Sequence, residues 1–113
     1  DMFGKLSVLY ALGSWQGAVA NRWKGQINEN SKNLVLNNTY PELNHNEILG
    51  WVKANEQGIA GFVGILLTDG NESAKMKKRA EVTEGLIEGV CKFTTVAAKG
   101  ETLLEKLLSL VFL

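Results

Sequence analysis

Apolar residues along this chain alternate between short continuous runs and stretches in which they recur at helical spacing. Four runs rich in branched and aromatic residues predict strands, at residues 5–12, 33–37, 58–69 and 93–98. Apolar positions spaced by three or four residues predict helices at residues 14–28, 45–52 and 101–112, and within residues 69–92. This order of elements predicts an α/β fold, a three-layer sandwich with a mainly parallel sheet flanked by helices.

The amphipathic segments also predict which side chains face the core. In the first helix we expect Ser14 to be the N-cap. Its apolar stripe is formed by Trp15, Val19, Trp23 and Ile27. The apolar positions expected in residues 69–92 are Met76, Val82, Leu86, Ile87, Val90 and Cys91. Gly58, Gly61 and Gly64 fall in the third predicted strand, where they are expected to permit close helix packing.

A sheet of this kind binds its ligand at the carboxyl ends of the strands, near a reversal in strand order. The sequence places those ends at residues 12–14, 36–40, 68–70 and 98–100. Gly13 and Ser14 form a turn that is compatible with an anion at a helix N-terminus, but such turns are common. The chain contains neither a P-loop nor a complete dinucleotide fingerprint.

Composition narrows the classes of function. The chain of 113 residues suits one domain, and its 45% hydrophobic content supports a packed core. Twelve Lys and Arg balance twelve Asp and Glu, which argues against a nucleic-acid surface. A single cysteine, Cys91, cannot form an internal disulfide, and there is no Cys/His cluster with zinc spacing. These features predict a reduced, intracellular protein, and the first residue, Asp1, suggests a segment of a longer one.

Two polar segments carry the candidate chemistry. In "NENSK" (residues 28–32) the polar residues fit a helix C-terminus with Asn30 as the cap and Lys32 stabilised by the dipole. Glu29, however, is a carboxylate where the dipole disfavours negative charge, which suits it to accept a proton. In "PELNHNEILG" (residues 41–50), His45 fits either a structural histidine or an acid–base group.

Other chemistries are poorly supported by the spacing. "HNE" is not the paired-histidine motif of zinc proteases, and no serine or cysteine lies in a nucleophile elbow. A carboxylate and an imidazole remain, Glu29 and His45. Without a cofactor, such a pair can move a proton between adjacent carbons of a sugar.

The two segments together resemble a known family. "RWKGQINENSK" (residues 22–32) and "PELNHNEILGW" (residues 41–51) are similar to the bifunctional phosphoglucose/phosphomannose isomerases, built from two sugar-isomerase (SIS) domains. The family patterns read R-[FW]-K-x-Q-[IL]-N-E-N-[AS]-K and E-x-N-H-N-E-I. The match is to the carboxy-terminal SIS domain, which implies a flavodoxin-like sandwich over residues 1–113 in a longer two-SIS-domain enzyme. Gly25 departs from the threonine often found in this pattern.

The resemblance implies roles for particular residues. Glu29 falls on the catalytic base that moves a proton between C1 and C2 through a cis-enediol, and His45 on the histidine that opens the sugar ring. Substrate-binding positions implied by the motifs are Arg22, Gln26, Asn28, Asn44 and Asn46. The family's phosphate-binding loop lies in the preceding SIS domain, and its active-site lysine follows Leu113.

The function implied is the interconversion of glucose 6-phosphate or mannose 6-phosphate with fructose 6-phosphate. It requires no metal and no cofactor, and it belongs to cytoplasmic carbohydrate metabolism, in glycolysis and gluconeogenesis. In related isomerases the histidine reaches the active site from the partner subunit, which implies a homodimer in which His45 crosses the interface. The alternative is a non-catalytic SIS module that binds a phosphosugar or dimerises. Neither interpretation involves nucleic acid or a membrane.

Overall fold

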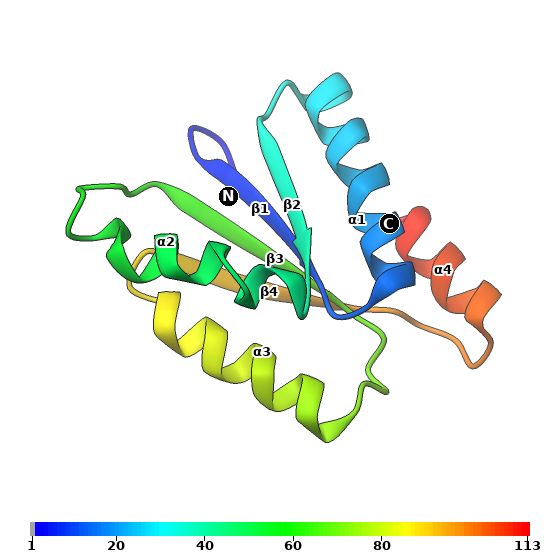
Figure 1. Ribbon diagram of the computed structural model, residues 1–113. Helices are drawn as coiled ribbons and strands as arrows, with labels where there is room; N and C mark the ends of the chain where they lie inside the picture. The colour runs from blue at the N-terminus through cyan, green and yellow to red at the C-terminus, as the bar shows by residue number, and fades with distance from the viewer. Residues whose placement is uncertain (1) are drawn as a thin grey trace.

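The computed structural model describes residues 2–113, which form a parallel sheet between two layers of helices (Figure 1). The strands are β1 (Leu6–Ala11), β2 (Val35–Thr39), β3 (Phe62–Thr68) and β4 (Cys91–Ala97). The α-helices are α1 (Ser14–Gln26), α2 (Glu47–Ala54), α3 (Ala74–Ile87) and α4 (Leu103–Val111). A π-helical turn, η1 (Ile27–Ser31), extends α1, and a 3-10 turn, η2 (Glu42–Asn44), precedes α2. The α/β sandwich predicted from the sequence is therefore confirmed.

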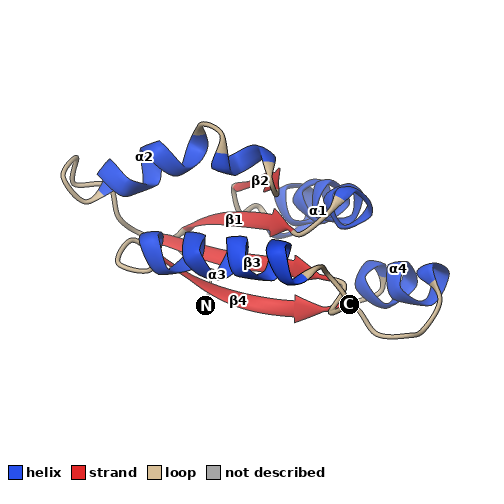
Figure 2. Cartoon of the chain, turned by 60° about the horizontal axis from the view of Figure 1, so that its bottom comes forward, coloured by secondary structure: helices blue, strands red, loops and turns tan. Residues whose placement is uncertain are grey.

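The strands lie in the order β2-β1-β3-β4, and all three neighbouring pairs are parallel. The order reverses between β1 and β3. Consequently α1 and α4 cover one face of the sheet, and α2 and α3 cover the other (Figures 1 and 2). Each helix that follows a strand runs back along the sheet, so its C-terminus lies at the amino ends of the strands.

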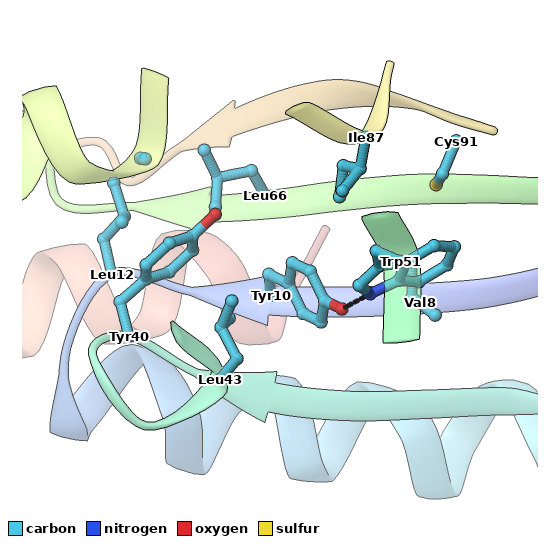
Figure 3. Close-up of a cluster of buried hydrophobic side chains, with 10 residues drawn as sticks. Val8, Tyr10, Leu12, Tyr40, Leu43, Trp51, Leu66, Ile87 and Cys91 are labelled. Atoms are coloured by element: carbon cyan, nitrogen blue, oxygen red, sulfur yellow. Dashed lines mark hydrogen bonds between the residues drawn. The ribbon is translucent and has the colours of Figure 1, made fainter. Parts of the chain in front are cut away.

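Side chains alternate across β1, and the sheet therefore contributes to two separate cores. On the face of α1 and α4, the indole of Trp23 donates a hydrogen bond to the carbonyl of Leu110 over 2.8 Å. The predicted stripe of α1 packs on this side as expected. On the face of α2 and α3, Tyr10 lies among other buried side chains, including Trp51 and Ile87 (Figure 3).

Several predicted boundaries were wrong by one to four residues. Ser14 is the first residue of α1 and Gly13 is the N-cap, without a side-chain hydrogen bond. A Cβ at residue 13 would lie 2.5 Å from Oε1 of Gln16, so the buried Gln16 side chain leaves no room for a side chain at this position. Gly58 and Gly61 precede β3 with φ of +71° and +84°, since they form the turn that enters the strand. Gly64 lies within β3 and makes room for a ring of β4, that of Phe93, rather than for a helix.

The predicted core face of α3 also requires correction. Val82 and Leu86 are 51% and 57% exposed, because α3 turns only the stripe containing Ala80, Thr83 and Ile87 toward the sheet. Cys91 is buried, but it begins β4 instead of extending the helix. Burial raises the pKa of its thiol to about 11, which keeps the thiol protonated at neutral pH.

The charges along α3 oppose its helix dipole, and this leads to a stability prediction. Its first turn contains Lys75 and no carboxylate, and its last turn contains no basic residue. We expect Lys75→Glu to increase the free energy of unfolding by about 0.3–1 kcal/mol, since a negative charge is favoured at a helix N-terminus. Urea unfolding of the full-length protein measures this change. Lys75→Gln is the control and should give a smaller increase, whereas a decrease with both variants would contradict the prediction.

Candidate active site

The two predicted acid–base residues flank the edge strand β2, one at each end. Glu29 lies in η1, which leads into the amino end of β2, and His45 follows η2 at the carboxyl end. The five residues of β2 extend the chain by roughly 15 Å. A single copy of the chain therefore does not bring Glu29 and His45 together. The expectation that a ligand lies at the carboxyl ends of the strands accounts for the position of His45 but not for that of Glu29.

Glu29 occupies a π-helical turn, a local widening that is frequent at functional sites. The turn ends at Lys32, whose φ of +55° is left-handed and whose ammonium donates to the Glu29 carbonyl. Lys32, and not Asn30 as expected, is therefore the C-cap residue. Asn30 instead donates from Nδ2 to Oε1 of Gln26 over 2.9 Å. The Glu29 side chain is exposed, and its carboxylate has no hydrogen bond or ion pair within residues 2–113.

Asn28 ties this turn to the sheet. Its Oδ1 accepts a hydrogen bond from the backbone N–H of Val35 over 2.8 Å, and its Nδ2 donates to the Val35 carbonyl over 3.5 Å. The side-chain amide is thus paired with the first residue of β2, as a neighbouring strand would be. This pairing fixes the residue next to Glu29, and it uses both polar atoms of a side chain that was predicted to contact substrate.

Arg22 and Gln26 lie on the exposed side of α1 and line one hollow of about 370 Å³. Trp23, Ile27 and residues at the end of α4 form the apolar part of this hollow. Both side chains are within the helix that carries Glu29. The structure therefore gathers, on one side of the molecule and near the amino ends of the strands, four predicted site residues: Arg22, Gln26, Asn28 and Glu29.

His45 is exposed and borders a second hollow, of about 300 Å³. Asn44 shares this hollow, but its Nδ2 donates to Oγ1 of Thr83 on α3 over 2.7 Å. Asn46 is exposed at the N-cap of α2 and makes no capping hydrogen bond through its side chain. Of the predicted residues on this side, His45 and Asn46 are therefore the ones whose side chains face solvent.

The sequence did not reveal that Arg79 borders the His45 hollow. Arg79 lies in a run of basic residues on α3, and it is half-buried beside η2. Arg79 and Glu42 thus bring one positive and one negative side chain to the hollow that His45 borders. Spacing within α3 carries no signal of this contact, because it depends on how η2 packs against a helix more than 30 residues away in sequence.

Neither a metal-binding cluster nor a membrane-spanning helix is found in the part of the chain that the structure describes. Residues 2–113 contain no group of three or more His, Cys, Asp and Glu side chains that could hold a metal ion. Within the same residues, none of the helices has the length and apolar character needed to cross a membrane.

A four-stranded parallel sheet layered between two pairs of helices is consistent with a sugar isomerase (SIS) domain. The model of the "Bacterial phospho-glucose isomerase C-terminal SIS domain" matches residues 1–113, and the chain belongs to this family. Bifunctional phosphoglucose/phosphomannose isomerases are similar to it. That of Caldicellulosiruptor bescii is 33% identical over 113 residues, covering 99% of this chain and 33% of the relative.

Two further relatives have the same name. The isomerase of Aquifex aeolicus is 36% identical over 87 residues, covering 77% of this chain and 26% of the relative. That of Thermoplasma acidophilum is 32% identical over 107 residues, covering 95% of this chain and 32% of the relative. The chain thus spans about a third of the length of the curated relatives it matches.

Proposed function

We propose that this chain is the carboxy-terminal SIS domain of a two-SIS-domain isomerase that interconverts glucose 6-phosphate or mannose 6-phosphate with fructose 6-phosphate. The observation that supports this proposal is an exposed carboxylate and an exposed imidazole at the two ends of one edge strand, in a chain that belongs to an isomerase family. The whole enzyme would act in the cytoplasm, in glycolysis and gluconeogenesis.

In the proposed mechanism, Glu29 and His45 transfer protons at different atoms of the substrate. His45 would open the hexose ring by moving a proton between the C1 hydroxyl and the ring oxygen. Glu29 would then take the proton from C2 of the open-chain aldose as O1 gains a proton, which gives the cis-enediol. It would return the proton to C1 as the O2 hydroxyl loses one, which gives the ketose, so the net change on the oxygens is the transfer of one proton from O2 to O1. Each step is general acid–base catalysis by a side chain that is free of hydrogen bonds to other described residues.

We further propose that the working enzyme is a homodimer in which His45 of one copy serves the site of the other. Glu29 and His45 lie at opposite ends of β2, so a twofold axis perpendicular to this strand would place the amino end of one copy beside the carboxyl end of its partner. Apolar side chains near this edge support such an interface. Leu34, Leu36 and Leu49 are 63%, 48% and 69% exposed.

The activity of the full-length protein tests the proposal. We expect a coupled assay to detect fructose 6-phosphate formed from both glucose 6-phosphate and mannose 6-phosphate. Isothermal titration calorimetry with fructose 6-phosphate provides the comparison. Binding without turnover would identify a non-catalytic phosphosugar-binding module instead, and neither binding nor turnover would contradict both interpretations.

A further inference from the structure

A hydrogen-bond cluster lies directly after His45, centred on Glu47, the first residue of α2. The Glu47 carboxylate accepts hydrogen bonds from three elements. Oε1 accepts from the Tyr10 hydroxyl on β1 and from Nε1 of Trp51 on α2, the latter over 3.4 Å. Oε2 accepts from Nδ2 of Asn38 on β2 over 2.6 Å. One side chain therefore joins the start of α2 to two strands of the sheet.

Sheet register brings these partners together. Tyr10 and Asn38 are paired neighbours in the parallel ladder of β1 and β2, so their side chains lie on the same face. Trp51 lies one turn after Glu47 and donates from its indole to the Tyr10 hydroxyl over 2.5 Å (Figure 3). The cluster therefore continues directly into the core beneath α2.

Each hydrogen-bond partner of Glu47 in this cluster acts as a donor. Burial, followed by the hydrogen bond to Glu47, raises the pKa of Tyr10 well above its ordinary value, so the phenol keeps its proton and donates it. Oδ1 of Asn38 accepts from the backbone N–H of Thr39 over 2.8 Å, which leaves Nδ2 to face Glu47. Trp51 can only donate. Residue 47 must therefore accept at both oxygens, as a carboxylate does and an amide does not.

The segment between η2 and α2 has few other attachments. Asn46 makes no capping hydrogen bond, and the His45 imidazole is exposed. On one side of His45, Asn44 is bound to Thr83 of α3, and on the other side Glu47 is bound to the sheet. His45 thus lies between two side-chain attachments, one residue after Asn44 and two residues before Glu47.

We propose that Glu47 is a positioning residue of the isomerase, which holds the N-terminus of α2 on the sheet and thereby sets the position of the His45 imidazole. This inference rests on the proposed role of His45. Glu47 itself does not touch substrate in this arrangement, because both of its oxygens are occupied by protein donors. Its effect should therefore appear in kcat and not in KM.

The test is an exchange of amide and carboxylate in the full-length enzyme. Glu47→Gln keeps the shape but sets an NH₂ against the NH₂ of Asn38, and we expect kcat to fall roughly 10- to 100-fold with KM nearly unchanged. In the double variant Asn38→Asp/Glu47→Gln, the new carboxylate can accept from residue 47 and still accept from Thr39. We expect this exchange to restore kcat to within about threefold of wild type. Glu56→Gln, at an exposed carboxylate just after α2 whose ion pair with Lys53 lies on the surface, is the control and should leave kcat unchanged.

Each outcome has a definite meaning. Unchanged kcat in Glu47→Gln, or a double variant no better than the single one, would overturn the inference. A loss of kcat that disappears when the assay temperature is lowered in step with Tm would also overturn it, since it would reflect unfolding alone. A His45→Asn variant is assayed alongside. If it retained full kcat, the proposed role of His45 would fail, which is a result distinct from failure of the Glu47 inference.

Discussion

Glu29→Gln in the full-length isomerase should lower kcat by roughly 100-fold or more, because a positioned general base contributes about that much to proton transfer. Glutamine keeps the size of the side chain and removes its ability to take the proton from C2. KM should change little, since in the proposed mechanism Glu29 acts on the transferring proton and not on the phosphate. The exposure of Glu29 at the π-helical turn makes a loss of stability a poor explanation of such a result.

The rate of C2 exchange measures the same step directly. In deuterated water, the wild-type enzyme should exchange the C2 hydrogen of glucose 6-phosphate with solvent, and Glu29→Gln should not, as followed by proton NMR. Glu56→Gln is a suitable control, because this carboxylate is also exposed and its ion pair with Lys53 lies on the surface. Retention of exchange and turnover in Glu29→Gln would remove Glu29 from the mechanism.

Mixing two inactive variants should restore activity if His45 crosses the dimer interface. Full-length Glu29→Gln and His45→Asn each lack one member of the pair in both sites. After subunit exchange, a heterodimer has one site with both native residues and one with neither. With random exchange, about a quarter of wild-type activity should return, since half of the dimers are mixed and each has one of two sites intact.

The same mixture distinguishes the alternative arrangement. If Glu29 and His45 of one chain served the same site, every site of the heterodimer would lack one native residue, and activity would not return. Affinity purification of the mixture through a tag on one variant confirms that exchange has occurred if the untagged variant is recovered with it.

Leu34→Glu should weaken the dimer if the edge of β2 forms the interface. Leu34 is exposed in the single chain, and a glutamate at this position would lose its hydration when the two copies associate.

The sequence predicted the elements well where the hydrophobic pattern was strong. The strand at residues 5–12 and the apolar stripe of α1 agree with the structure, since each pattern reflects burial on a sheet or along one helix face. Boundaries were less accurate where turns decide them. The predicted strand at residues 33–37 lies two residues later, at Val35–Thr39, because Asn28 pairs with Val35 and so determines where the strand begins.

Val82 and Leu86 illustrate a different limit. Their spacing in the sequence fits the apolar face of α3, but the helix lies over the sheet at a rotation that leaves both exposed. Periodicity alone does not distinguish a side chain that faces the core from one at the margin of the apolar face. The packing of α3 against β3 and β4 makes that distinction.

For the candidate site, the sequence by itself supplied the two predicted acid–base residues, Glu29 and His45. "NENSK" and "PELNHNEILG" supplied a carboxylate and an imidazole, and composition and spacing argued against zinc or nucleophilic chemistry. Only the tertiary structure decided where these groups lie. Since α1 runs back along the sheet and β2 runs forward again, Glu29 lies at the amino ends of the strands and His45 at the carboxyl ends. The cluster around Glu47 likewise depends on the register that sets Tyr10 beside Asn38, a relation between strands that no local pattern contains.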